Sequence, residues 1–236
     1  MSIVLPVYRL ESVIVENVDL VFDALGDLEP EVILVDDGSN DGTADAIARA
    51  ALRHPIKSVT LPVNRGKGRA LLEGWKIATG DYIVFLDADL DLPPHQIPEL
   101  IDQLISSDVD VLVGTKKTTM RGSYPGVRRI LSRVFALLTE GIFRLPVSET
   151  QTGLKVFRRK VLETVAGNVR VDRYAFDLEL LARAHAAGFE LSETPVTLSP
   201  GAATASLRPS MMWSLARDTL RIAWWKLTDP SFRRPS

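Results

Sequence analysis

The chain has 236 residues, of which 46% are hydrophobic and 25% are charged, a globular composition that excludes disorder, collagen and coiled coil. It has no cysteine, which excludes disulfides, thiolate metal sites and cysteine nucleophiles. Its 28 Lys and Arg nearly balance its 30 Asp and Glu, which argues against a generally basic nucleic-acid-binding protein.

Residues 1–115 alternate the signals of strands and helices. Short apolar runs predict strands, and apolar residues at helical spacing predict helices between them. The expected strands are residues 2–7, 32–35, 57–61, 82–86 and 109–113, and the expected helices are residues 13–25, 43–52, 67–78 and 94–105. This alternation predicts an α/β fold with a mostly parallel sheet, in which ligands bind beyond the C-terminal ends of the strands.

The second half of the chain has a less regular pattern. The expected helices are residues 127–138, a stretch from 160 onward, and 176–187, and the expected strands are 153–157 and 189–193, the latter ended by Pro195. Residues 201–210 are small and polar, and residues 211–227 combine Trp and Met with Arg and Lys, as in an amphipathic helix. We therefore expect one folded domain over residues 1–200, and over residues 201–236 a flexible segment and that helix.

Positive charge is concentrated in the second half of the chain. Residues 116–160 contain eleven Lys or Arg and two acidic residues, and residues 208–236 contain six and two. This asymmetry suggests an anionic substrate or membrane surface, although solvated helix faces would give the same pattern. No apolar run approaches the ~18 residues of a membrane span, and Arg9 and Glu11 come too early for a signal peptide. We expect an intracellular protein that is soluble or lies on a membrane surface.

Three acidic residues follow the strand expected at residues 82–86. Asp87, Asp89 and Asp91 can converge on one hard divalent cation, Mg²⁺ or Mn²⁺, which keeps positions for phosphate oxygens. A metal there would neutralise a diphosphate leaving group. The same pattern is common in simple turns, so the spacing alone leaves both interpretations open.

Two further polar loops follow expected strands. Asp36 can accept hydrogen bonds from a base or ribose, and Ser39 or Asn40 can cap the following helix, which alone would explain that loop. The loop NRGKG, residues 64–68, lets the backbone approach a ligand and offers Lys67 as a charge for phosphate. It matches neither a Walker A loop nor a G-x-G-x-x-G motif, and the lack of G-x-S-x-G leaves a hydrolase triad without support.

Five segments in order resemble the family-2 glycosyltransferases of the GT-A fold, and among them the polyprenyl-phosphate mannose and glucose synthases. Residues 4–8, VLPVY, resemble the family's V-x-P-x-Y-N-E start, with Arg9 in place of the usual Asn. The other segments are ILVDDGSNDGT (33–43), the block from NRGKG to LDADLDLPP (64–94), QTGLKVFRR (151–159) and YAFDLELLARAHAAGFELSETPV (174–196). The resemblance covers residues 2–197 and implies a GT-A catalytic domain with a Rossmann-like, mostly parallel sheet flanked by helices.

The resemblance also implies roles for individual residues. The nucleotide would be bound by Pro6, Tyr8, Asp36, Asp37, Ser39, Lys67 and Asp87. The metal would be bound by Asp89 and Asp91, where relatives often carry Gln at the second position. The catalytic set would be Asp87, Asp89, Arg128, Arg133, Gln151 and Glu179, and the acceptor phosphate would be held by Arg121, Arg128, Arg129 and Arg133.

The activity that the resemblance implies is metal-dependent, inverting transfer of a hexose from a UDP- or GDP-sugar to a polyprenyl monophosphate. The acceptor phosphate is an anion near neutral pH, so positioning and electrostatics replace a strong general base. The helix expected at residues 211–227 would contact an anionic leaflet at the cytoplasmic face. A membrane-protein partner stays open, and nucleic acid is not expected.

Three alternatives to this activity are considered. The same fold can act on a soluble or glycan acceptor, and a non-catalytic subunit would bind nucleotide sugar and metal without turnover. A sugar nucleotidyltransferase would need a glycine-rich loop near the N-terminus, which residues 7–10, VYRL, do not form. Relatives often carry an Asp-Arg pair after the Pro-Val strand, whereas Thr197 and Leu198 follow here. This difference weakens the prediction of a lipid acceptor more than it weakens the prediction of a glycosyltransferase.

The helix at residues 211–227 can pack on the domain or form a dimer contact instead of contacting a membrane. No residue separates a UDP from a GDP donor or fixes the sugar.

Overall fold

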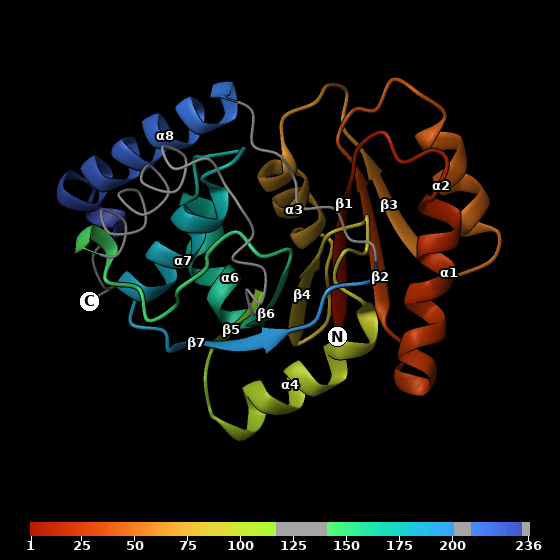
Figure 1. The fold of residues 1–236 in the computed structure, drawn as a ribbon, viewed down its shortest axis with the longest axis horizontal. Coiled ribbons are helices and arrows are strands. Elements are labelled where there is room, and N and C mark those ends of the chain that lie inside the picture. Colours follow the sequence, from red (N-terminus) through yellow and green to blue (C-terminus); the bar gives the residue numbers. More distant parts are fainter. Residues whose placement is uncertain (117–140, 201–208, 233–236) are drawn as a thin grey trace.

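The computed structural model describes residues 1–116, 141–200 and 209–232, and over these residues the chain forms one sheet between two layers of helices (Figure 1). The sheet order is β3-β2-β1-β4-β6-β5-β7. The strands are β1 (Ser2–Val7), β2 (Glu31–Asp36), β3 (Ile56–Thr60), β4 (Tyr82–Leu86), β5 (Val111–Lys116), β6 (Leu154–Arg158) and β7 (Leu191–Val196). All neighbouring pairs are parallel except those of β6, which runs antiparallel to both β4 and β5.

Alternate residues of the strands bury opposite faces of the sheet. Ile3, Leu5 and Val7 pack with the helices α1 (Ile14–Leu25), α2 (Thr43–Ala51) and α4 (Ile97–Ser106). Val4 faces the other layer, which contains α3 (Lys67–Trp75), α6 (Arg159–Val165) and α7 (Phe176–Ala186). The period of two along each strand therefore divides the core into two layers. Short 3₁₀ turns are η1 (Gly26–Leu28), η2 (Pro94–Gln96), η3 (Ala166–Asn168) and η4 (Pro230–Phe232).

The last helix, α8 (Pro209–Thr228), packs against α7 at the end of the molecule opposite α1 and α2 (Figure 1). Its inner face buries Ile222 beside Leu178 and Ala182 of α7. Its outer face exposes Trp213 and Trp224. Among the described residues, no helix combines the length and the apolar character that crossing a membrane requires.

The predicted α/β fold with a mostly parallel sheet is confirmed, and the differences are local. The strand expected at 189–193 lies at Leu191–Val196 and continues through Pro195. β7 is an edge strand, and proline is tolerated in edge strands because one of their sides makes no ladder hydrogen bonds. The expected capping of α2 by Ser39 or Asn40 is wrong, because the helix begins later and Gly42 stands at its N-cap. The helix expected at 127–138 and residues 201–208 of the flexible segment expected at 201–210 lie outside the described residues, and the last helix begins at Pro209 instead of residue 211.

Glu31, the first residue of β2, joins three parts of the sheet. Its carboxylate accepts hydrogen bonds from the Thr79 backbone N–H at 2.7 Å and hydroxyl at 2.9 Å, and it contacts the Ser2 hydroxyl and the Lys57 ammonium. Burial alone would raise the pKa of Glu31, but these donors outweigh it and lower the pKa from 4.5 to about 2. The charged carboxylate therefore stabilises the fold above pH 4.5 and loses this effect as the pH falls toward about 2.

Replacing Glu31 with glutamine should lower the free energy of unfolding by about 1–2 kcal/mol at pH 7, since it removes charge-assisted hydrogen bonds. The difference from the wild type should shrink below pH 4.5 and vanish near the pKa of about 2. Urea unfolding of both proteins across this pH range measures it. A difference that stays constant with pH would contradict the prediction.

Candidate functional site

A cavity of about 630 Å³ opens where the carboxyl ends of β1 and β4 meet the start of α3. Its lining comes from segments that are far apart in sequence: the end of β1 and the residue after β2, the loop into α3, the turn after β4, Gln151, and the segment that leads into α7. These residues are Pro6, Val7, Tyr8, Leu10, Asp37, Asn64, Gly66, Lys67, Gly68, Asp87, Ala88, Asp89, Gln151, Arg173, Tyr174 and Asp177. The location agrees with the expectation that ligands bind beyond the carboxyl ends of parallel strands.

An ion pair between Lys67 and Asp87 lies in the cavity wall. The Nζ atom of Lys67 is 2.5 Å from Oδ1 of Asp87, and about a third of the Lys67 side chain is exposed (36%). Burial lowers the pKa of Lys67, but the charges of Asp87 and Asp177 outweigh it and raise that pKa above its ordinary value. Lys67 therefore stays protonated and offers a fixed positive charge to an anionic ligand.

Negative charge accumulates beside this pair. Asp89 lines the cavity wall, and its Oδ1 accepts a hydrogen bond from the Asp91 backbone N–H at 3.3 Å. Burial and the neighbouring charges of Asp87 and Asp91 raise the pKa of the Asp89 carboxyl, with Lys67 acting in the opposite direction. A cation beside Asp89 would relieve this repulsion.

Asp91 itself does not line the cavity. Its backbone carbonyl instead accepts a hydrogen bond from the Ser199 N–H at 2.8 Å. Within the described residues, no three His, Asp or Glu side chains converge on a common metal position. The donor set at Asp87 and Asp89 thus fits a hard cation of the Mg²⁺ type, which commonly uses one or two carboxylates and takes its other ligands from water and substrate phosphates.

Gly153 allows β6 to begin directly against Asp87. Its carbonyl accepts a hydrogen bond from the Asp87 N–H at 3.0 Å. A Cβ atom at position 153 would lie 2.1 Å from Oδ2 of Asp87, so any side chain here would force this carboxylate or the start of β6 to shift. The antiparallel pairing of β4 with β6 is what places Gly153 beside the acidic turn.

The backbone N–H groups of the loop before α3 are occupied by other parts of the protein. Asp37 accepts hydrogen bonds from the N–H of Arg65 at 2.7 Å and of Gly66 at 2.8 Å. The carbonyl of Asp172 accepts from the N–H of Gly68 at 2.9 Å. These N–H groups are therefore engaged within the protein, while Gly66, Lys67 and Gly68 line the cavity and Lys67 offers its side chain there.

The two glycines of this loop serve close packing. A Cβ atom at Gly68 would lie 2.3 Å from the Phe176 ring. Gly66 has a φ of +109°, a conformation that residues with a side chain rarely adopt. The sequence motif thus reflects contact with the segment that precedes α7.

Asp36 and Ser39 do not line the cavity, in contrast to the other expected nucleotide-binding residues Pro6, Tyr8, Asp37, Lys67 and Asp87. Asp36 is fully buried, and its Oδ1 accepts a hydrogen bond from the Ser39 N–H at 2.9 Å. Its Oδ2 is buried and has no hydrogen-bond partner among the described residues. The hydroxyl of Ser39 accepts a hydrogen bond from the Arg9 N–H at 2.9 Å.

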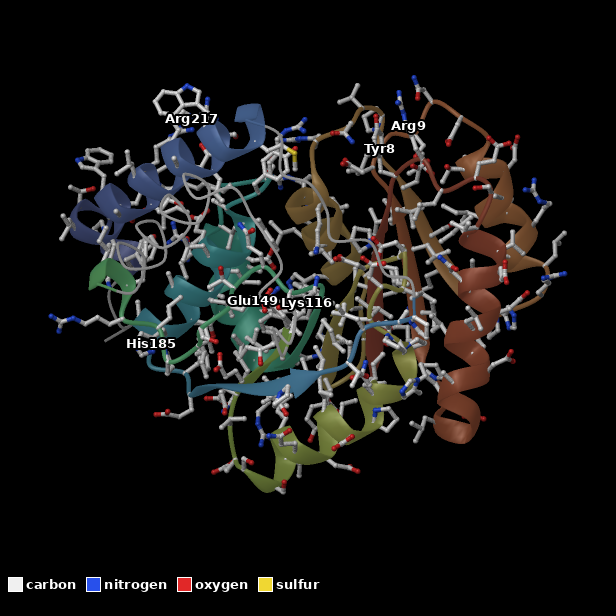
Figure 2. All side chains as sticks on the ribbon, in the orientation of Figure 1. Tyr8, Arg9, Lys116, Glu149, His185 and Arg217 are labelled. Atoms are coloured by element: carbon white, nitrogen blue, oxygen red, sulfur yellow. The ribbon has the colours of Figure 1, made fainter. Side chains whose placement is uncertain are left out.

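Tyr8 and Arg9, both labelled in Figure 2, follow β1, and Tyr8 lines the cavity. The Tyr8 ring is 41% exposed, and the Arg9 guanidinium lies 5.3 Å from its centre. Arg9 has a φ of +54°. Asparagine tolerates this left-handed conformation better than arginine does, which gives a backbone reason for the Asn that relatives carry here.

The structure does not bring Glu179 to the cavity. Its side chain is fully buried, and Oε1 accepts a hydrogen bond from Arg183 Nε at 2.8 Å. Oε2 accepts from the N–H groups of Arg170 at 3.0 Å and Val171 at 2.8 Å. The expected catalytic role of Glu179 thus has no geometric support, because both of its carboxylate oxygens accept hydrogen bonds from other parts of the protein.

Gln151 does line the cavity, and its side-chain amide donates to the Tyr174 carbonyl at 3.0 Å. The expected acceptor-phosphate residues Arg121, Arg128, Arg129 and Arg133 lie outside the described residues. Their position relative to the cavity therefore stays a prediction.

Sequence reasoning missed Lys155 and Arg173. Lys155 is buried, and its ammonium donates to Asp177 Oδ1 at 2.7 Å and to the Thr152 carbonyl at 2.5 Å. Burial lowers the pKa of Lys155, which Asp177 opposes and Lys67 reinforces. Arg173 lines the cavity and donates to the Asn64 carbonyl at 3.2 Å. The position of Lys155 in the apolar run LKVF could have indicated a buried ion pair, because charged side chains are rarely buried without a partner.

The sequence is similar to longer glycosyltransferases. It is 29% identical over 233 residues to glycosyltransferase AglD of Haloferax volcanii, covering 96% of this chain and 37% of that protein. It is 29% identical over 201 residues to dolichyl-phosphate beta-glucosyltransferase ALG5C of Trichomonas vaginalis, covering 82% of this chain and 59% of that protein. The match to dolichol-phosphate mannosyltransferase of Pyrococcus furiosus is 29% identical over 173 residues, 71% of this chain and 48% of that protein. The chain thus spans between about a third and three fifths of the length of these curated relatives.

The fold is similar to that of solved GT-A glycosyltransferases. Glucosyl-3-phosphoglycerate synthase of Mycobacterium tuberculosis, crystallised with Mn²⁺, UDP and glucosyl-3-phosphoglycerate, matches with a TM-score of 0.71 at 20% identity, covering 97% of this chain and 80% of that one. The mannosyltransferase PcManGT of Pyrobaculum calidifontis, solved with GDP-Man and Mn²⁺, matches with a TM-score of 0.65 at 23% identity, covering 98% and 66%. These likenesses establish the GT-A fold. The model of glycosyl transferase family 2 matches residues 2–166, more than half of the sequence, and the chain therefore belongs to this family.

Proposed function

We propose that the chain is a metal-dependent, inverting glycosyltransferase that moves a hexose from a UDP- or GDP-sugar to a polyprenyl monophosphate. The observation that carries this proposal is the charge layout of the cavity. A fixed cation, Lys67, lies 2.5 Å from Asp87, and the crowded carboxylate Asp89 lies next to them. A nucleoside diphosphate with a divalent metal complements both charges.

The donor would lie between the end of β1 and the turn after β4. Asp89, assisted by Asp87, would hold Mg²⁺ or Mn²⁺, which supplies charge neutralisation for the departing diphosphate. Asp91 does not line the cavity, so its proposed contribution is to add to the negative charge that attracts the metal. Lys67 would bind a phosphate oxygen, and Pro6 and Tyr8 would contact the nucleoside. The Mn²⁺ and nucleotides in the related crystal structures support this arrangement.

The acceptor phosphate would attack the sugar from the side of Gln151 and Asp177. Because this phosphate is already an anion, the protein has to hold it in line and offset its repulsion from the donor phosphates. We propose Arg121, Arg128, Arg129 and Arg133 for this task. Two of the relatives named above act on dolichyl phosphate according to their names, which supports a lipid phosphate as acceptor.

The outer face of α8 suits contact with an anionic leaflet at the cytoplasmic face. Trp213, Leu220, Trp224 and Leu227 are 62–79% exposed and recur at spacings of three, four and seven residues, which places them on one side of the helix. Arg217, labelled in Figure 2, interrupts this stripe. Exposed tryptophans with basic neighbours are typical of helices that lie in a membrane interface. A membrane-protein partner on this face is the other occupant that the proposal allows.

A soluble phosphorylated acceptor is the second candidate. The likeness to glucosyl-3-phosphoglycerate synthase extends over 97% of this chain, which supports such an acceptor. The lipid-phosphate relatives are longer than this chain, so their activity is a weaker guide. A non-catalytic subunit would bind donor and metal without turnover.

A transfer assay tests the proposal. The protein is incubated with Mn²⁺ or Mg²⁺, labelled UDP- or GDP-sugars, and a polyprenyl phosphate in anionic vesicles, with phosphoglycerate as the soluble acceptor. We expect label in the organic phase, loss of transfer with EDTA, and sedimentation of the protein with anionic but not neutral vesicles. Label only in a water-soluble product would select the second candidate. Donor binding without transfer or hydrolysis would contradict enzymatic activity.

A further inference from the structure

We propose that Lys155 is a positioning residue that fixes the sugar-side wall of the cavity, through the Asp177 carboxylate and the Thr152 carbonyl. The inference rests on the proposed transferase function and deepens it. Lys155 is 1% exposed and does not line the cavity, so it acts through its neighbours and touches no ligand itself.

Burying the Lys155 ammonium group in a core strand is unfavourable in free energy by itself. It stands in β6 between Leu154 and Val156, which belong to the apolar core. A buried ammonium needs partners that replace its hydration, and apolar residues fill most such positions in a core strand. Its two partners are Asp177 Oδ1 at 2.7 Å and the Thr152 carbonyl at 2.5 Å.

The first partner faces the cavity. Asp177 is the second residue of α7 and is 7% exposed, and it belongs to the cavity lining. Lys155 holds its Oδ1, which leaves Oδ2 as the oxygen that can meet a ligand. Asp177 also acts on Lys67, whose own partner is Asp87. Positive and negative charges therefore alternate from the buried Lys155 to the three side chains Asp177, Lys67 and Asp87 in the cavity wall.

The second partner connects Lys155 to the acidic turn. Thr152 precedes Gly153, whose carbonyl accepts the N–H of Asp87 at 3.0 Å. One ammonium thus fixes both the wall that contains Asp177 and the segment against which Asp87 is held. Lys155 thereby sets the distance between the sugar-side carboxylate and the proposed metal side.

The alternative is that the Lys155–Asp177 pair only stabilises the fold. The two roles differ in the double variant Lys155→Met with Asp177→Asn, because removing both charges of a buried pair is often neutral for stability. Because Asp177 lines the cavity, the reference for kcat is Asp177→Asn alone. If the pair only stabilises the fold, the double variant recovers the melting temperature and has the kcat of Asp177→Asn. If Lys155 positions the wall, the double variant recovers the melting temperature, but its kcat falls below that of Asp177→Asn because the Thr152–Gly153 segment is released.

The experiment compares wild type, Lys155→Met, Lys155→Arg, Asp177→Asn and the double variant in kcat, donor KM and thermal unfolding. We expect Lys155→Met to lower kcat about 100-fold, as for a misplacement near 1 Å, with donor KM changed less than about threefold. Lys155→Arg should retain kcat within about tenfold, because it keeps the charge. The matched control is Lys160→Met, since Lys160 lies close by in sequence, is exposed and pairs with Asp110 at 2.7 Å. A double variant with the same kcat as Asp177→Asn would overturn the proposal.

Hydrogen exchange separates this proposal from the proposed function. If the wild type transfers no sugar to any acceptor, the proposed function fails, and exchange at the Asp87 amide still tests Lys155. Exchange there should be faster in Lys155→Met and in the double variant than in wild type, because the Thr152–Gly153 segment is released. Unchanged exchange at Asp87 would overturn the positioning role.

Discussion

Replacing Asp89 with asparagine is expected to lower kcat by about 1,000-fold, because the change removes the carboxylate that would bind the metal at the leaving group. Asparagine keeps the size and shape of the side chain. Burial and the charges of Asp87 and Asp91 raise the pKa of Asp89, so its ionised form is disfavoured in the folded protein. At neutral pH the variant should therefore unfold at a temperature equal to or above that of the metal-free wild type.

Transfer rates over a Mn²⁺ titration and thermal unfolding in EDTA measure these two effects. Asp102→Asn is the matched control, since Asp102 is exposed on α4 and is not part of the cavity wall. It should leave kcat unchanged. An Asp89→Asn protein with wild-type dependence on Mn²⁺ would remove Asp89 from the metal site.

Replacing Gly153 with alanine is expected to lower kcat by at least about 100-fold, since it displaces a reacting-site group by a distance of the order of 1 Å. The added Cβ would lie 2.1 Å from Oδ2 and 2.5 Å from Cγ of Asp87. Either the carboxylate turns away from Lys67, which breaks the 2.5 Å ion pair, or the start of β6 moves. Both responses change the geometry at the donor end.

Gly167→Ala is the control for this substitution, because a Cβ atom at Gly167 meets nothing within 4 Å. It should retain wild-type kcat. Steady-state kinetics and donor binding by calorimetry distinguish the two variants. Wild-type activity of Gly153→Ala would mean that the position of Asp87 does not matter for transfer.

The fold could be predicted because its strands and helices produce hydrophobic patterns within short stretches of the sequence. Central strands of a parallel sheet are buried on both faces and read as continuous apolar runs, as in residues 32–35 and 82–86. The acidic turn could be found for the same reason, since Asp87 and Asp89 follow such a run directly. Strand ends were less certain, because hydrogen bonding rather than hydrophobicity decides whether an edge strand extends through Pro195.

The other half of the site depends on contacts that are distant in sequence. The pairing of β4 with β6 brings Gly153 beside Asp87, and no local pattern reports this pairing. The assignment of Glu179 shows a second limit. Residues two apart on a helix point in nearly opposite directions, so Asp177 faces the cavity while Glu179 faces Arg183 on the same helix. A sequence motif gives the order of the residues and does not state which side of the helix each residue faces.

The single antiparallel strand of the sheet also bears on how such a chain can acquire a new acceptor. β5 runs parallel to β7 and antiparallel to β6, so the chain departs at Lys116 and re-enters at Gln151 on the same edge of the sheet that holds Asp87. Lys116 and Gln151 thus both lie beside the turn that contains Asp87. Under the proposed function, a designed exchange of the sequence between these two residues that keeps the core side chains Phe143 and Val147 changes the acceptor side, and it leaves the sequence of β1 to β4, with the turns proposed to bind the donor, as it is.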